Sequence, residues 1–221
     1  MVNSKQSKEQ FLRNVKNHTM RVEMDDGVHR SLVFSNDDTF NQHFRINTWP
    51  GYLCISGDMG CYVFSRIYDM FKFFRSEDNE IEINPGYWAE KLQAHDHFGG
   101  YREFSKDSFD EDILEKVREQ CEEEDHPLTD RIIVAMCDKL SDVGESHECC
   151  MQFVNDFSVD DLQDTLSIIT TNDEDEILDR AGMPNINFID YWESMRSHYS
   201  PTYHYLWCLY AIVWAIGVYD G

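Results

Sequence analysis

The chain has 221 residues and a mass of 26.1 kDa, and 42% of its residues are hydrophobic and 14% aromatic. This is enough apolar material for one packed domain or two small ones, which excludes a chain that is disordered throughout. Asp and Glu number 42 against 19 Lys and Arg, for a formal net charge of -23. A field of that sign repels nucleic acid and anionic membranes and attracts basic surfaces, so we expect no direct nucleic-acid binding and no membrane partner.

The first third of the chain predicts a helix followed by an antiparallel sheet. Residues 8–17 have helical apolar spacing, and Ser7 with Gln10 fits a capping box in front of them. The period then changes to two, which is typical of strands separated by short turns. Strands are expected over 18–24, 28–34, 40–48, 52–55 and 61–64, with turns at 25–27 and 57–60. The expected sheet therefore has four or five strands.

From residue 65 onward the apolar pattern is helical. Residues 67–74 have that spacing, and Asn84 with Pro85 fits the N-cap and first position of a helix that reaches Leu92. Further helices are expected near 108–124, 128–141, 145–156, 158–170, 174–181, 187–197 and 203–219. Strands first and helices afterwards indicate an α+β protein, an N-terminal antiparallel sheet with flanking helices followed by an acidic all-helical half.

The domain organisation is expected to follow the glycine pair at 99–100. It suggests an α+β lobe over 1–100 and an acidic helical lobe over 101–221, although one continuous domain fits the pattern as well. The apolar run 205–219 falls short of the ~20 residues of a membrane span, so we expect a buried core helix in the second lobe. Most of the five tryptophans should be core residues, and exposed aromatic side chains would mark an interface, such as that of a homodimer.

The compartment is expected to be the cytoplasm. The first residues have no apolar signal-peptide core, and the seven cysteines are an odd number with no C-x-x-C pair. Such cysteines are typical of free thiols in a reducing environment.

The acidic excess is concentrated in residues 101–180, which carry 25 Asp and Glu against 7 Lys and Arg. In the helix near 108–124 the acids recur every three or four residues and therefore share a face. One interpretation is a solvated helix face. The other is that rows of carboxylates imitate a phosphate backbone and occupy a basic groove of a partner. The carboxylates that would make these contacts are Glu111, Glu115, Glu119, Glu122, Glu123, Asp160, Asp161, Asp164, Asp173, Glu174, Asp175 and Glu176.

Several short segments carry side chains that could bind a metal, but none has a recognised spacing. They are His95-Asp96-His97, His126 after Glu122 to Asp125, and His147-Glu148-Cys149-Cys150. No zinc-finger, H-E-x-x-H or EF-hand pattern is present, and Ser56 to Gly60 forms neither a phosphate loop nor a nucleophile elbow. We therefore predict no catalytic residues, metal or cofactor. The alternative is a small enzyme or metal protein with His95, His97, Asp58 or Cys149 and Cys150 near a pocket.

Three segments carry a resemblance to known sequences. They are 48–66 (TWPGYLCISGDMGCYVFSR), 83–92 (INPGYWAEKL), and 205–208 (YLWC) with 211–214 (AIVW). Together they resemble a family of uncharacterised proteins encoded by bacteriophages and prophages, which supplies no catalytic residues.

What the resemblance implies is a biological context. Small acidic phage proteins often bind host proteins, and several anti-CRISPR and anti-restriction proteins imitate DNA. By that analogy we expect an inhibitor that binds a nucleic-acid-binding host defence protein through a basic groove. A phage structural or accessory protein is the other alternative.

Overall fold

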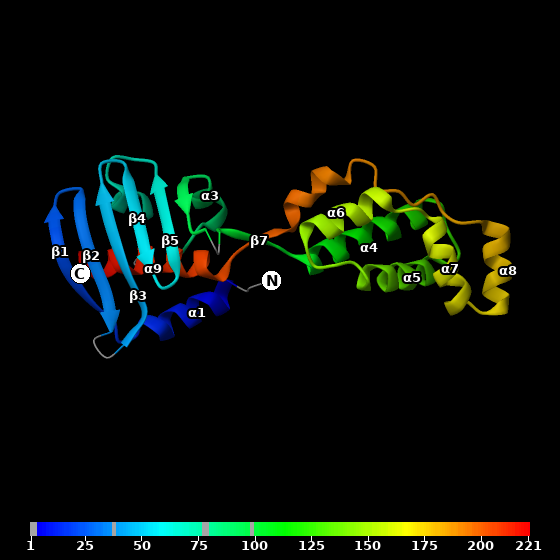
Figure 1. Ribbon diagram of the computed structural model, residues 1–221, viewed down its shortest axis with the longest axis horizontal. Coiled ribbons are helices and arrows are strands. Elements are labelled where there is room, and N and C mark those ends of the chain that lie inside the picture. The colour runs from blue at the N-terminus through cyan, green and yellow to red at the C-terminus, as the bar shows by residue number, and fades with distance from the viewer. Residues whose placement is uncertain (1–3, 37–38, 77–79, 98–99) are drawn as a thin grey trace. The chain divides into compact units, whose positions relative to one another are not determined.

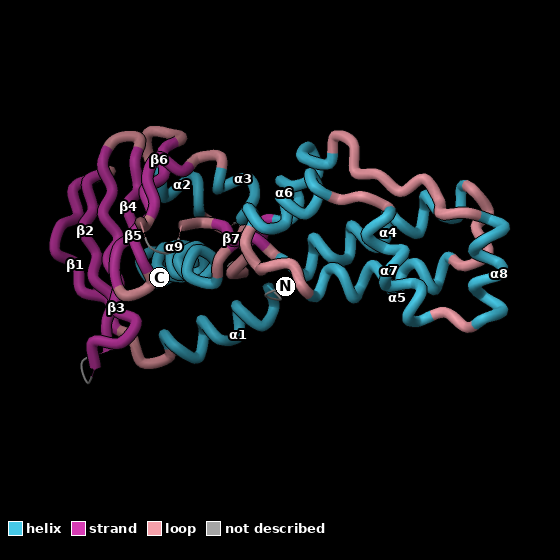
Figure 2. The backbone as a smooth tube through the Cα atoms, turned by 45° about the vertical axis from the view of Figure 1, so that its right-hand side comes forward, coloured by secondary structure: helices cyan, strands magenta, loops and turns pink. Residues whose placement is uncertain are grey.

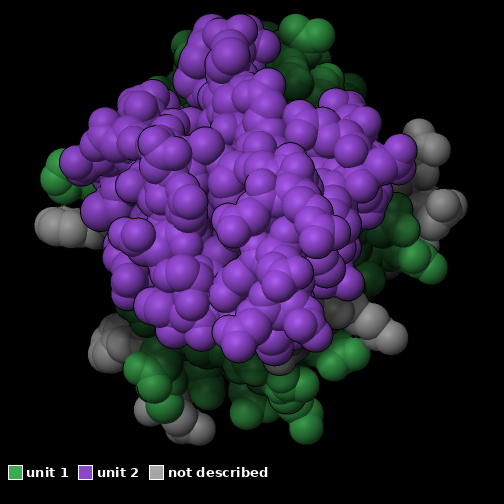
Figure 3. Space-filling view, turned by 90° about the vertical axis from the view of Figure 1, so that its right-hand side faces the viewer, with its two compact units in different colours: residues 1–103, 200–221 green, residues 104–199 purple. Residues whose placement is uncertain are grey.

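The computed structural model describes residues 4–36, 39–76, 80–97 and 100–221, and the chain divides into two compact units (Figures 1 and 3). The first unit comprises Met1–Glu103 and Ser200–Gly221, and the second Phe104–Tyr199. The chain passes between them through β7 (Arg102–Phe104) and β8 (Tyr199–Pro201), which pair as a two-stranded sheet.

The first unit contains an antiparallel sheet of six strands in which each strand pairs with its neighbours in sequence (Figure 1). The strands are β1 (Thr19–Asp26), β2 (His29–Asn36), β3 (Thr39–Trp49), β4 (Tyr52–Gly57), β5 (Gly60–Ser65) and β6 (Leu92–His95). The first five confirm the expected strands. The α+β class is also confirmed, since a largely helical part of the chain follows the sheet.

The sixth strand replaces the end of a predicted helix. α3 (Pro85–Ala89) begins as expected, because Asn84 accepts a hydrogen bond from the Tyr87 amide and Pro85 follows it. It ends at Ala89, however, and Leu92 pairs with Phe64 of β5. The helical prediction through Leu92 is therefore wrong, because pairing with the sheet edge satisfies the backbone of β6.

The turn between β4 and β5 confirms the hairpin expected at 57–60. β4 ends at Gly57 and β5 starts at Gly60. A Cβ atom at Gly57 would collide with the carbonyl oxygen of His43 on β3, so the close approach of the two backbones requires glycine there.

One face of the sheet is covered by α1 (Ser4–Val15) and α9 (Tyr203–Asp220), with α2 (Met70–Phe74) beside them (Figure 2). α9 is buried almost all round, as its unbroken apolar run predicted. The indole of Trp207 meets the rings of Phe11 and Phe44 edge to face, at centroid distances of 5.2 and 5.6 Å.

Two predictions about these helices are wrong. The C-terminal helix shares its core with the sheet, so it belongs to the first unit and not to the acidic lobe 101–221. Ser7 is a buried residue inside α1, which begins at Ser4, so Ser7 and Gln10 form no capping box. None of the helices in the described ranges is long and apolar enough to cross a membrane.

The second unit is helical and has a separate core. Its elements are α4 (Lys106–Glu123), α5 (Thr129–Ser141), α6 (His147–Asp156), α7 (Asp160–Ile169), α8 (Asn172–Ala181) and the 3-10 helix η1 (Tyr191–His198). The first five lie close to their expected positions. The segment expected as an α-helix over 187–197 is instead η1, preceded by irregular chain and a turn at 189–190.

Candidate functional site

The second unit is strongly acidic because its carboxylates far outnumber its cations, and four of those cations are already paired within the unit. Residues 104–199, all of them described, carry 26 Asp and Glu against 7 Lys and Arg. Four of the seven cations form internal ion pairs. These pairs are Lys106–Asp110 at 2.6 Å, Arg118–Asp130 at 3.2 Å, Arg131–Glu174 at 2.8 Å and Arg180–Glu176 at 3.7 Å. The remaining carboxylates far outnumber the remaining cations.

The clearest row of these carboxylates lies along α4. Phe109, Ile113, Val117 and Cys121 are buried at intervals of four residues and fix which face of α4 meets the core. The predicted site residues on this helix fall on the opposite face and are all exposed. This row, which we call the α4 stripe, consists of Glu111, Glu115, Glu119, Glu122 and Glu123. None of the five has a side-chain hydrogen bond or an ion pair in the fully described second unit.

The carboxylates at the start of α7 have mixed roles. Asp160 and Asp164 are exposed and unpaired. Asp161 accepts a hydrogen bond from the Ser158 amide at 3.1 Å, while the Ser158 hydroxyl accepts one from the Asp160 amide at 3.4 Å. Through these hydrogen bonds Asp161 helps to stabilise the N-terminus of α7.

The carboxylates of α8 are mostly engaged in local structure. Glu174 completes a capping box with Thr171 and binds Arg131 of α5, and the hydrogen bond from Arg131 is the main cause that lowers the pKa of Glu174. Asp175 accepts a hydrogen bond from Thr170, and Glu176 lies 3.7 Å from Arg180. Of the predicted site residues on this helix, Asp173 alone is exposed and unpaired. Sequence alone could not separate these roles.

Two pockets of the second unit include predicted site residues. One, of about 660 Å³, brings Glu122 and Glu174 together with Arg118 and Arg131, so its charge is mixed. The other, of about 410 Å³, lies between the end of α5 and helices α6 and α7. Asp161, Asp142 and Asp156 line it beside the rings of Phe153 and Phe157.

The histidines and cysteines considered as metal ligands have other partners or lie apart. The Nδ1 atom of His126 accepts a hydrogen bond from the Leu128 amide at 3.2 Å, so Nε2 carries the proton and donates to the Gly182 carbonyl at 2.9 Å. Cys149 is exposed whereas Cys150 is buried, as expected for neighbours on a helix. Within the described ranges, no three His, Cys, Asp or Glu side chains come together as a metal site.

A buried polar network that the sequence did not reveal joins α4 to η1. The Tyr191 hydroxyl donates to Asp112 Oδ2 at 2.6 Å, so His198 Nε2 must donate to the Tyr191 oxygen at 2.9 Å. His198 Nδ1 then accepts from the Ser108 hydroxyl at 3.1 Å. Burial lowers the pKa of His198, which agrees with this neutral form. His198 and Tyr191 are only 2% and 3% exposed, so the network stabilises the unit and offers no open side to a substrate.

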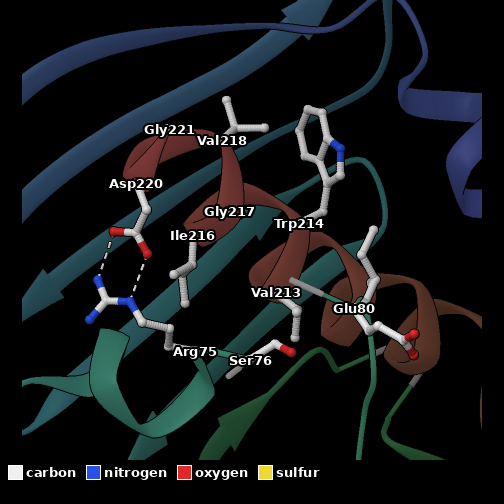
Figure 4. Close-up of a pocket in the computed structure, with 11 residues that line it drawn as sticks. Arg75, Ser76, Glu80, Val213, Trp214, Ile216, Gly217, Val218, Asp220 and Gly221 are labelled. Atoms are coloured by element: carbon white, nitrogen blue, oxygen red, sulfur yellow. Dashed lines mark hydrogen bonds and ion pairs between the residues drawn. The ribbon is translucent and has the colours of Figure 1, made fainter. Parts of the chain in front are cut away.

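The first unit has a pocket of about 470 Å³ at the C-terminal end of α9 (Figure 4). Arg75 forms two hydrogen bonds with the Asp220 carboxylate at 2.6 and 2.7 Å along its edge. Trp214 and Val213 supply apolar lining. This salt-bridged pocket has no histidine, cysteine or hydroxyl pair arranged for catalysis among its described lining residues.

The tryptophans divide between core and surface. Trp88 and Trp207 are buried and Trp214 packs against the same core. Trp49 is 38% exposed and stacks on Tyr52 at a centroid distance of 5.3 Å, and Trp192 is 59% exposed. A homodimer through such aromatic side chains stays a prediction.

Comparison with known proteins identifies no relative of this chain. No protein-family model, curated protein or solved structure matches it. The resemblance to phage-encoded proteins therefore stays an expectation from the sequence.

Proposed function

We propose that the second unit binds the basic, nucleic-acid-binding surface of another protein and blocks nucleic acid from it. The observation that supports this proposal best is the set of exposed carboxylates with no partner in the unit. Those that we assign to the binding face are the five residues of the α4 stripe together with Asp160, Asp164 and Asp173. Lys and Arg side chains that normally bind phosphate would form charge-assisted hydrogen bonds with them.

The density of charge along α4 supports imitation of a phosphate backbone. The α4 stripe extends from Glu111 to Glu123, a rise of about 18 Å at 1.5 Å per residue. Its five carboxylates therefore follow one another at a mean interval of about 4.5 Å along the helix axis, against about 3.4 Å for the phosphates of one DNA strand. A groove built to bind one DNA strand would meet a comparable linear charge on this helix.

The cost of the stripe to the stability of α4 also supports a role in binding. Like charges spaced three or four residues apart destabilise a helix by about 0.2–0.5 kcal/mol per pair. The stripe contains several such pairs. A sequence selected only for solubility would interleave positive charges, as α4 does with Lys116 and Arg118 outside the stripe.

The biological context that we propose is inhibition of a bacterial defence complex of CRISPR or restriction type in the cytoplasm of an infected cell. The partner is a nuclease or nucleic-acid-binding subunit with a basic groove. The acidic unit would bind this groove in place of DNA or RNA, and the protein itself would not bind nucleic acid.

Capture of partners from a bacterial lysate tests this function. The immobilised full-length protein should retain a basic nucleic-acid-binding protein at low salt, release it at high salt, and release it to added double-stranded DNA at low salt. A control with Glu145→Gln and Glu193→Gln changes net charge by two at exposed positions outside α4 and should capture the same protein. Retention that is indifferent to salt and DNA would contradict the proposal.

A further inference from the structure

Two cysteine sulfurs lie close together on the face of the sheet that points away from its core. Cys54 of β4 lies between the buried residues Leu53 and Ile55, and Cys61 of β5 precedes the buried Tyr62. Because side chains alternate along a strand, both cysteines point to the opposite face. Their Sγ atoms are 4.0 Å apart, and Cys61 is exposed to solvent.

The register of the hairpin places the two cysteines on a diagonal. Cys54 is opposite Val63, and Cys61 is opposite Ser56, so the two residues are not direct partners. Diagonal neighbours are separated by roughly 7–8 Å at the backbone, whereas a disulfide usually needs Cα atoms about 4.4–6.8 Å apart and an S–S bond of about 2.05 Å. The sheet therefore opposes a disulfide while it holds the two sulfurs at 4.0 Å.

The separation fits a metal ion bound between the sulfurs. Two metal–sulfur bonds of about 2.3 Å span about 3.8 Å at the tetrahedral angle and about 4.6 Å when collinear. The observed 4.0 Å lies between these limits, so an ion can be bound with little movement of either strand.

The number and type of ligands select the ion. In the described ranges no third His, Cys, Asp or Glu joins this pair to make a larger metal-binding group. Structural zinc takes four protein ligands, and hard cations take oxygen ligands. A pair of thiolates is sufficient for a soft monovalent ion, and thiolates select Cu(I).

We propose that Cys54 and Cys61 bind one Cu(I) ion between their two sulfurs. Each thiol releases its proton to solvent on binding, and the copper stays in the +1 state. A cation between the sulfurs replaces the repulsion of two thiolates by attraction to both, which favours deprotonation. The site is in the first unit and is independent of the acidic face.

The test is an anaerobic titration of the reduced full-length protein with Cu(I) in competition with a chromophoric Cu(I) chelator. Wild type should withdraw one equivalent of copper from the chelator, and Cys54→Ser and Cys61→Ser should each abolish that withdrawal. Cys137→Ser and Cys149→Ser are matched controls, since both residues are exposed cysteines of the second unit, and both should bind as wild type does. X-ray absorption of the loaded protein should show two sulfur ligands at about 2.3 Å or slightly less.

Three results would overturn the proposal. One is copper binding by Cys61→Ser equal to that of wild type, with circular dichroism showing that the variant is folded. Another is failure of wild type to compete with the chelator. The third is rapid formation of a Cys54–Cys61 disulfide under a mild thiol oxidant, seen as a loss of two hydrogens in the intact mass of the folded protein, because it would mean that the sheet does not hold the sulfurs apart.

Discussion

Neutralising the middle of the α4 stripe should make the protein more stable. The variant with Glu115→Gln and Glu119→Gln retains side-chain size and removes two charges. It eliminates five like-charge pairs spaced three or four residues apart, and it loses two attractive pairs of the same spacing. The like-charge pairs are Glu111/Glu115, Asp112/Glu115, Glu115/Glu119, Glu119/Glu122 and Glu119/Glu123, and the attractive pairs are Glu115/Arg118 and Lys116/Glu119. The net loss of three repulsions at about 0.2–0.5 kcal/mol each predicts a gain of about 1 kcal/mol in the free energy of unfolding.

Urea unfolding followed by circular dichroism of the helices measures this gain. The gain should be present at low ionic strength and should vanish near 1 M salt, where the Debye length is only about 3 Å. The control variant with Glu145→Gln and Glu193→Gln loses the same charge at exposed positions off α4, so it should gain much less. An unchanged or lower stability of the α4 variant at low salt would refute the reasoning, because it would mean that other groups of the unit already offset the repulsion between the carboxylates of the stripe.

Three further predictions concern the second unit. Since burial lowers the pKa of His198 in the folded state, the unfolded chain takes up the proton first as the pH falls through about 6.5. Wild type should therefore lose stability between pH 7.5 and 5.5 relative to His198→Gln, as measured by the two thermal midpoints, and parallel changes in both proteins would contradict this. Tyr191→Phe leaves Asp112 and His198 without their shared hydroxyl, so the free energy of unfolding in urea should fall by about 1–3 kcal/mol, whereas an unchanged value would mean that water replaces the hydroxyl. Thr171→Ala removes the capping box of α8 and should cost about 1 kcal/mol, seen as faster hydrogen exchange confined to that helix, and Thr171→Ser should restore most of the protection.

The sequence predicts the fold well where local signals and tertiary packing agree. The strands of the hairpins, the cap at Asn84 and the buried C-terminal helix all follow from alternation, turn residues or an unbroken apolar run. It fails where contacts between distant parts of the chain determine which element forms or which unit an element joins. β6 forms because Leu92 finds Phe64 at the edge of the sheet, and α9 joins the first unit because its apolar surface packs against β5 and α1. Neither partner can be identified from periodicity.

The candidate site was predictable in position but not in detail. The spacing of the α4 acids placed them on one face, and the buried residues of α4 put that face toward solvent. The roles of Glu174 and Asp161 could not be foreseen in full, because the first depends on Arg131 of another helix and the second on bonds around Ser158. The Cys54 and Cys61 pair could have been found by writing out the register of the predicted hairpin.

The most direct test of the central claim is competition between this protein and double-stranded DNA for the captured basic partner. Wild type should displace labelled DNA from the partner at low salt. A variant in which Glu111, Glu115, Glu119 and Glu122 are all replaced by Gln should need at least about four times more protein for the same displacement, because the four lost ion pairs contribute roughly 0.2–1 kcal/mol each. The Glu145→Gln and Glu193→Gln control should compete nearly as well as wild type. Equal competition by the four-residue variant would contradict binding through the α4 stripe.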